Sequence, residues 1–368
     1  MTAIIDKYFR DLSDKIGFLE LKNVKELYID YGLNDIPLPI ISEDLMLALQ
    51  NNHLENEVDS KYIIDGMLFS LGVDPDFRYA KDYINVVKNI LEAPSKYAIS
   101  RSIEAIDKDF ERALVFSRAA KILDPNDKFA SYTYARLLWR VEVDEKEKSD
   151  FIARSIEILE EILAIDSEFG LCYYELANIY AGLGRYMKAM SFYRNTLEKV
   201  DIETIKEEIR EKMEAIEADA LVEEAIQFIN RMDYKRALGL LNQVQRNVTR
   251  YDVLYYMAVC YMNLEELSLA DEYFDLAVKG GADFATLYID YIFVKYSMGK
   301  PVEALALANE AIDKYPADLK IRYNRALIEV ELDRIDKAIE DLDFILEYAD
   351  LSDEFSSQVR MVRNSLCS

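Results

Sequence analysis

Small residues recur at a fixed interval within apolar segments that have helical spacing. Ala304 lies 34 positions before Ala338, and Ala270 lies 34 before Ala304. The series continues upstream through Ala237, Ala189, Ser155 and Ala113. A period near 34 residues is typical of a two-helix unit, which buries its apolar face only by stacking on neighbouring units. The pattern therefore predicts an all-α solenoid of stacked, antiparallel helix pairs.

A second series of small residues precedes the first by twelve positions in most units. Its members are Ala177, Ala225, Ala258 and Ala326, with Ala135 in a unit that carries an insertion and Ile292 in the penultimate unit. Helices approach closely where side chains are small, and a larger residue there separates the axes or causes strain. Both series are therefore expected to be buried. One series would lie where the two helices of a pair meet, and the other where a pair meets the next pair.

Two intervals are longer than the period. The eight extra residues between Ala113 and Ser155 fall near 141–150, which is highly charged and predicts a loop or a helix extension. The fourteen extra residues between Ala189 and Ala237 fall near 201–216. Because Gly and Pro are absent there and charges recur at helical spacing, we predict one lengthened helix that runs to about Met232.

The first 95 residues repeat less clearly, and we predict that 1–95 form an N-terminal helical cap and 96–368 the repeat array. Ala80 is the candidate small residue of one degenerate unit within the cap. The segment before Ser42 is expected to be a loop, with Ser42 capping the helix that follows because Glu43 and Asp44 occupy its first turn.

The units resemble the tetratricopeptide repeat (TPR) family over about residues 96–350. Residues 173–197, YYELANIYAGLGRYMKAMSFYRNTL, carry the aromatic, the Leu-Ala pair, Tyr180, Gly184, Ala189 and Tyr193 expected of such a unit. The resemblance implies a right-handed superhelix of antiparallel helix pairs. In this family the first helix of each pair lines a concave surface that holds extended peptides.

Composition narrows the possible functions. Apolar residues make up 51% of the chain, which excludes disorder, and 11 Gly with 7 Pro are few for an all-β fold. The net charge of −25 argues against nucleic-acid binding, which needs a basic surface, but allows a basic protein partner. No segment has the ~20 consecutive apolar residues that a membrane-spanning helix requires.

The first residues and the cysteines indicate the cellular compartment. Charged residues interrupt the first apolar segment, so we expect no secretion signal. The cysteines, Cys172, Cys260 and Cys367, are odd in number and far apart, which favours a reduced, cytoplasmic setting.

The sequence offers little for catalysis. His53 is the sole histidine, no Cys or His pair has zinc-ligand spacing, and no glycine-rich phosphate loop occurs. Glu207 and Glu211 have the plain spacing of a solvated helix face. We therefore predict no enzyme, no metal site and no cofactor.

If the resemblance holds, the first helices present a tyrosine-rich concave surface, because tyrosine combines contact area with a hydroxyl group. The candidate partner-binding residues are Tyr132, Arg136, Trp139, Tyr174, Asn178, Tyr255, Tyr256, Met262, Phe293, Tyr296, Tyr323, Asn324 and Leu327. Several of these tyrosines are equally expected to pack between helices.

Asn324 lies in a segment, RYNRA, that resembles the repeats that clamp the C-terminal carboxylate of heat-shock chaperones. The preceding unit has Ile289 and Phe293 at the positions where that clamp needs Lys and Asn, and Glu354 and Gln358 replace its cations. The clamp is incomplete, so Asn324 is expected to bond a peptide backbone or to bind nothing.

The sequence thus predicts a non-enzymatic interaction scaffold or adaptor that binds a protein or peptide segment. Two alternatives stay open. An escort chaperone for a secreted or assembling partner would bind long unfolded segments, whereas a peptide-sensing regulator would bind a short defined peptide. The sequence does not indicate the partner or the oligomeric state.

Overall fold

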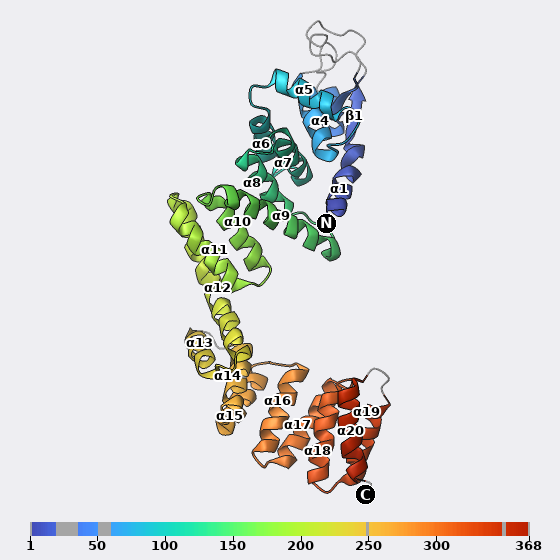
Figure 1. Ribbon diagram of the computed structural model, residues 1–368, viewed down its shortest axis with the longest axis vertical. Helices are drawn as coiled ribbons and strands as arrows, with labels where there is room; N and C mark the ends of the chain where they lie inside the picture. The colour runs from blue at the N-terminus through green and yellow to red at the C-terminus, as the bar shows by residue number, and fades with distance from the viewer. Residues whose placement is uncertain (1, 20–35, 51–59, 248–249, 348–350, 367–368) are drawn as a thin grey trace. The chain divides into compact units, whose positions relative to one another are not determined.

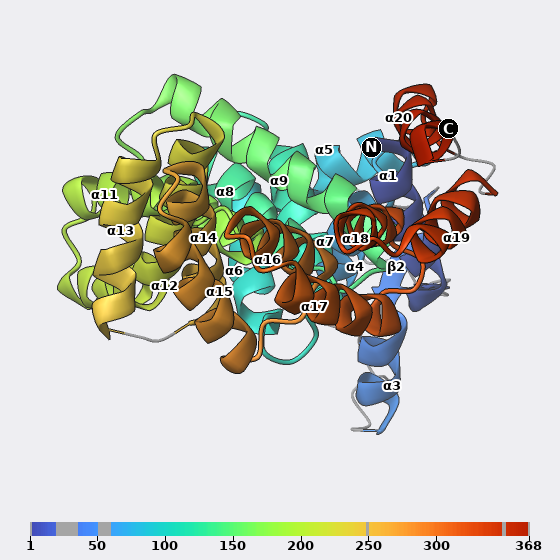
Figure 2. The same cartoon turned by 90° about the horizontal axis from the view of Figure 1, so that it is seen from below.

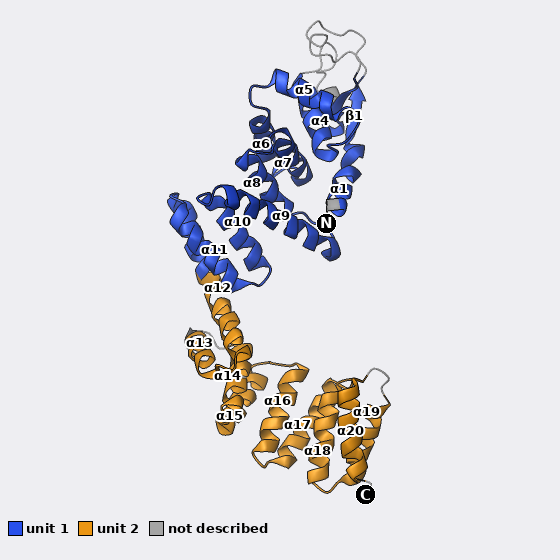
Figure 3. Ribbon diagram, viewed as in Figure 1, with its two compact units in different colours: residues 1–213 blue, residues 214–368 orange. Residues whose placement is uncertain are grey.

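The computed structural model describes residues 2–19, 36–50, 60–247, 250–347 and 351–366. The chain divides into two compact units, residues 1–213 and 214–368, which Figure 3 colours separately. Both are built from helices, and the described residues include one pair of short strands. The predicted all-α solenoid of helix pairs is therefore confirmed, with the addition of a small sheet near the N-terminus.

The first unit opens with a segment that contains this sheet (Figure 1). Its elements are α1 (Thr2–Asp11), the 3-10 turn η1 (Leu12–Lys15), β1 (Ile16–Leu19), β2 (Leu38–Ile41), α3 (Ser42–Gln50), α4 (Ser60–Val73) and α5 (Ala80–Ile90). The strands are antiparallel, with Ile16 opposite Ile41 and Leu19 opposite Leu38. A Cβ at Gly66 would lie 2.2 Å from the carbonyl oxygen of Pro39, so glycine allows α4 to lie directly on β2.

The expected loop before Ser42 is wrong for Leu38–Ile41, which form β2 and are buried. A proline is tolerated in a strand whose second edge pairs with no other strand, and β1 is the one strand that pairs with β2 among the described residues. The helix predicted after this segment is present as α3, and Ser42, the predicted cap, is its first residue.

The N-terminal segment is anchored to the first repeat helices by arginines, one buried and two partly buried. The guanidinium of Arg118 donates hydrogen bonds to the carbonyl oxygens of Gly72 and Val73, at 3.0 and 3.2 Å. It also pairs with Asp6 and lies 4.2 Å from the ring centroid of Phe9. Further ion pairs join Arg101 to Asp65 and Arg112 to Asp44.

The remaining helices of the first unit form the start of the array. They are α6 (Pro94–Ala105), α7 (Phe110–Leu123), α8 (Lys128–Leu138), α9 (Glu145–Ile165), α10 (Gly170–Gly182), α11 (Tyr186–Lys199) and the first part of α12 (Glu203–Asn230). The predicted start of the array at residue 96 falls within the first turn of α6, and the division between the two units falls inside α12.

The second unit continues from α12 with regular pairs. Its helices are α13 (Tyr234–Asn247), α14 (Tyr251–Asn263), α15 (Leu267–Lys279), α16 (Ala285–Ser297), α17 (Pro301–Lys314), α18 (Leu319–Glu331), α19 (Ile335–Leu346) and α20 (Asp353–Leu366). The first helices α14, α16 and α18 follow one another across Figure 2, and α16 contacts both α14 and α18.

Both series of small residues are buried, as predicted. Exposure is zero for Ala113, Ser155, Ala189, Ala237, Ala270, Ala304, Ala338, Ala135, Ala177, Ala225, Ala258 and Ala326, and 1% for Ile292. Where the two series meet in the unit with the insertion, the Ser155 hydroxyl donates a hydrogen bond to the Ala135 carbonyl oxygen at 2.7 Å. The small side chains therefore mark the points of close helix approach.

Both insertions lengthen helices. The first extends the N-terminus of α9, which has 21 residues. The second gives α12 its 28 residues, so the predicted single long helix is confirmed.

The turns inside the five pairs from α10 to α19 each contain a left-handed residue. Gly184 and Gly299 have φ angles of 68° and 70°, and Met232, Glu265 and Asp333 adopt φ angles of 61°, 62° and 57° at the corresponding turns. Glycine reaches this conformation without the steric cost that a Cβ imposes, so three of the turns are strained.

Candidate functional site

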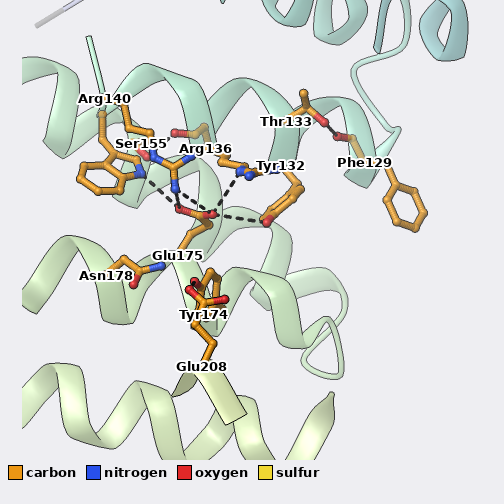
Figure 4. Close-up of polar contacts among 12 residues, drawn as sticks. Phe129, Tyr132, Thr133, Arg136, Arg140, Ser155, Tyr174, Glu175, Asn178 and Glu208 are labelled. Atoms are coloured by element: carbon orange, nitrogen blue, oxygen red, sulfur yellow. Dashed lines mark hydrogen bonds and ion pairs between the residues drawn. The ribbon is translucent and has the colours of Figure 1, made fainter. Parts of the chain in front are cut away.

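Three predicted site residues, two on α8 and one at its C-terminal cap, converge on a carboxylate that the sequence analysis missed. Glu175 on α10 is only 1% exposed (Figure 4). The Tyr132 hydroxyl donates to Glu175 Oε1 at 3.4 Å, and the Trp139 indole nitrogen donates to Oε2 at 3.3 Å. Arg140 donates to Oε2 at 3.1 Å, and Arg136 forms an ion pair with Oε1 at 3.4 Å.

The electrostatics of this cluster match its burial. Burial raises the pKa of Glu175, and the neighbouring Arg140, Arg136 and Trp139 oppose that rise. Tyr132, Trp139 and Arg136 are thus engaged by a carboxylate of their own chain, which ties α8 and the residue after it to α10.

Tyr174 and Asn178 are engaged by the start of α12. The Tyr174 hydroxyl donates to Glu208 Oε1 at 2.5 Å. Lys212 donates to the Tyr174 hydroxyl at 2.8 Å and to Asn178 Oδ1 at 2.9 Å, and Tyr193 donates to the same Asn178 oxygen at 2.8 Å. Glu208 and Lys212 follow Tyr174 and Asn178 by 34 positions, so this part of α12 stacks as the next first helix.

Tyr255 and Tyr256 belong to the rim of the core in the second unit. The Tyr255 ring lies edge-on to Phe284 at 4.9 Å, and the Tyr256 ring lies 5.2 Å from the Tyr255 ring. Met262 packs at the edge of the same core. Tyr323 likewise packs edge-on to Phe355 of α20 at 5.5 Å.

The other predicted residues of this unit form an open pocket. Phe293 and Tyr296 of α16 face Asn324 and Leu327 of α18 across a cavity of about 170 Å³. The remaining lining residues are Ile292 and Ile328. Phe293 is 53% exposed and Tyr296 is 37% exposed, so the pocket presents two aromatic side chains to solvent next to an amide.

Polar groups of the pocket lie at its edges. The Tyr296 hydroxyl hydrogen-bonds the Glu331 carboxylate, and this bond together with burial raises the pKa of Tyr296. For Asn324 the structure gives no hydrogen bond within the described part of the chain, so its amide is available to a ligand. The pocket therefore combines an apolar floor with a carboxylate and an amide at its edge.

The described residues hold no cluster of His, Cys, Asp or Glu suited to a metal ion. Burial raises the pKa of the Cys172 and Cys260 thiols to about 12, so both are protonated and poor nucleophiles near neutral pH. His53 and Cys367 lie outside the described residues. Among the described helices, none combines the length and apolar character needed to cross a bilayer.

No protein-family model matches the chain, and no curated protein matches it. Solved structures with similar arrangements include YrrB, described as a TPR protein with an unusual peptide-binding site. It is 19% identical, and the alignment covers 52% of this chain and 92% of YrrB with a TM-score of 0.37. The array resembles a TPR solenoid.

Two further structures are similar at the same level. A TPR protein from Parabacteroides merdae is 14% identical, with 74% of this chain and 99% of that one covered and a TM-score of 0.36. PilW, described as a type IV pilus biogenesis factor, is 13% identical, with 64% and 99% covered and a TM-score of 0.41. What these structures share with this chain is the arrangement of the helices.

Proposed function

We propose that this protein is a non-enzymatic interaction scaffold that holds a peptide segment of a partner in the pocket between α16 and α18. The observation that carries the proposal is the exposure of Phe293 and Tyr296 beside Asn324, a side chain for which the described residues provide no hydrogen-bond partner. An exposed aromatic side chain beside an amide suits a ligand that offers an apolar side chain and a backbone.

The first unit contributes less to this function. Its predicted binding residues engage Glu175, Glu208 and Lys212, whereas Asn324 of the second unit has no hydrogen-bond partner among the described residues. A ligand in the first unit would have to replace charged hydrogen bonds that already exist. We therefore place the binding site in the second unit. A cytoplasmic location is part of the proposal, and the two buried thiols agree with a reducing compartment.

A peptide library tests the proposal even though the partner is unidentified. Random dodecapeptides displayed on phage are selected on the full-length protein, and synthetic copies of the enriched sequences are titrated by fluorescence anisotropy. We expect Phe293→Ala to weaken their binding by about tenfold or more, because an aromatic anchor at the centre of an interface usually contributes more than ~1 kcal/mol.

Phe129→Ala is the matched control, because Phe129 on α8 is 52% exposed and has the same side chain as Phe293 at 53%. It should leave binding unchanged. If the two variants weaken binding equally, or if neither does, the pocket between α16 and α18 is not the binding site.

A further inference from the structure

The pocket lies within a longer row of apolar side chains. Val259, Phe293, Leu327 and Met361 follow one another at intervals of 34 on α14, α16, α18 and α20. Phe293 and Met361 are 53% and 73% exposed, and the other two are partly buried. The helix α14 contacts α16, α16 contacts α18, and residues of α18 and α20 share one core cluster. The four residues therefore occupy the same position on successive first helices, and we call this set the apolar row.

Carboxylates without a cation border the row. Asp290 lies one helical turn before Phe293, and Glu331 lies one turn after Leu327 and bonds Tyr296. Neither carboxylate forms an ion pair with a described residue. Asp290 accepts a hydrogen bond from the Tyr255 hydroxyl at 3.0 Å.

Most basic side chains of α16 and α18 form ion pairs with carboxylates on the second helices of the pairs, away from the apolar row. Lys295 binds Asp271 and Glu303 at 2.8 Å each. Arg325 binds Asp341 at 2.7 Å, and Arg322 lies 3.4 Å from the same carboxylate. Lys320 differs, because it is exposed in the first turn of α18, at the opposite end of that helix from Glu331.

Amide side chains accompany the row on one side. Asn324 lies one turn before Leu327, and Gln358 lies one turn before Met361. The structure gives neither side chain a hydrogen bond within the described residues. Amides of this kind bind the exposed backbone of an extended peptide, since each offers both a donor and an acceptor.

The spacing of the helices sets the spacing of the ligand. Packed helices lie about 8–10 Å apart, and three residues of a polyproline-II chain span about 9 Å. Such a chain has three residues per turn, so every third side chain points to the same side. A peptide that follows the apolar row in this conformation therefore places one side chain against each first helix.

We propose that the occupant of the apolar row is an extended, basic peptide with large apolar side chains at every third position and a Lys or Arg that pairs with Glu331. This inference rests on the proposed function and specifies its ligand. A second copy of this chain is disfavoured as the occupant, because each copy carries a net charge of −25.

Three synthetic peptides of equal length test the spacing and the charge. The reference peptide repeats Leu-Lys-Ser three times, its isomer places the three Leu at every second position, and an acidic version replaces Lys by Glu. Binding of each labelled peptide to the full-length protein is measured by anisotropy at about 0.05 M salt, where exposed charges are weakly screened. We expect the reference to bind at least about tenfold more tightly than the other two.

Glu331→Gln should weaken binding of the reference peptide by about two- to fivefold, the effect of one exposed ion pair. Glu347→Gln removes the same charge from an exposed position at the end of α19 and is the matched control, with an expected change of less than about 1.5-fold. The difference between the two variants should disappear at about 0.5 M salt.

The outcomes separate the inference from the proposed function. Equal binding of the isomer overturns the spacing, equal binding of the acidic peptide overturns the charge assignment, and equal effects of the two glutamate variants overturn the role of Glu331. If the designed peptides fail while library peptides still depend on Phe293, the inferred ligand is wrong and the binding site stands. If library peptides do not depend on Phe293, both proposals fail.

Discussion

The hydroxyl group of Tyr255 on α14 donates a hydrogen bond to the Asp290 carboxylate on α16, with 3.0 Å between the two oxygens. Burial raises the pKa of Asp290, and this bond opposes the rise. The pair therefore joins two successive first helices through a half-buried charge that has no cation beside it.

Tyr255→Phe should lower the free energy of unfolding of the second unit by about 0.5–1.5 kcal/mol, because it leaves a half-buried carboxylate without its donor. It should also raise the pKa of Asp290. Urea denaturation of Tyr255→Phe, Asp290→Asn and the double variant should show non-additive effects. Tyr251→Phe is the control, since Tyr251 is exposed on the same helix. Additive effects would mean that the bond contributes nothing.

Glu175 should make the stability of the first unit depend on pH. The pKa of Glu175 in the folded chain lies above the ordinary value of 4.5, which the unfolded chain keeps. At a pH between the unfolded-state pKa and the folded-state pKa, the folded state therefore binds more protons than the unfolded state. The free energy of unfolding therefore decreases as the pH rises through this interval and reaches its lower level above the folded pKa.

Glu175→Gln removes this titration. Relative to the variant, the wild type should lose stability as the pH is raised from about 4.5 toward neutrality, as measured by urea denaturation at a series of pH values. Parallel stability curves for the two proteins would show that Glu175 does not titrate differently in the folded state.

Ala258→Leu should cost about 1–3 kcal/mol of stability, because Ala258 is fully buried where helices approach closely. Ala306→Leu on the exposed face of α17 makes the same chemical change without overpacking and should be nearly neutral. The melting temperatures of both variants measure the difference. Equal melting temperatures would show that the helices separate there without strain.

Glu265→Gly should stabilise the second unit by about 0.5–1 kcal/mol. Glu265 has a φ angle of 62°, at which a Cβ is strained and glycine is not. Glu266→Gly is the control, because Glu266 has a φ angle of −84° and gains only chain entropy in the unfolded state. A loss of stability in both variants would show that the strain at this turn is negligible.

Tyr174→Ala combined with Asn178→Ala should lower the stability of the first unit by about 1–3 kcal/mol while leaving peptide binding unchanged, because both residues bond the start of α12. Thermal melting and anisotropy on the same variant measure the two effects. Loss of binding with unchanged melting would return the binding site to the first unit.

Much of the repeat array could be predicted from the sequence, because each helix pair needs a small buried residue at the same position where its helices meet. This requirement repeats along the chain and is visible in the spacing of the small residues. Ala258 and Ala270 could be assigned from their spacing alone. The strand β2 could not, because its burial depends on Gly66, which comes well after it in the chain and lets α4 lie on the backbone of Pro39.

The candidate site was harder to predict, because spacing identifies the face of a helix but not what meets it. Phe293 and Asn324 were expected to lie on one surface, and the structure brings them to one pocket. Tyr132 and Trp139 were expected there too, but Glu175 binds them. The sequence did contain an indication that Glu175 is buried: it lies among Cys172, Leu176 and Ile179, which form the buried apolar stripe of α10.

The contacts of Arg118 have a consequence for the order of folding. Its bond to Asp6 joins residues 112 positions apart, whereas the bond from Tyr174 to Glu208 spans 34 positions and links neighbouring helices. Closing a longer loop costs more entropy before any contact forms, and proteins dominated by distant contacts fold more slowly. The helix pairs are thus free to form from local contacts in any order, while docking of α1 waits until α7 is in place. During synthesis, α1 leaves the ribosome before α7 and yet docks only after α7 has formed.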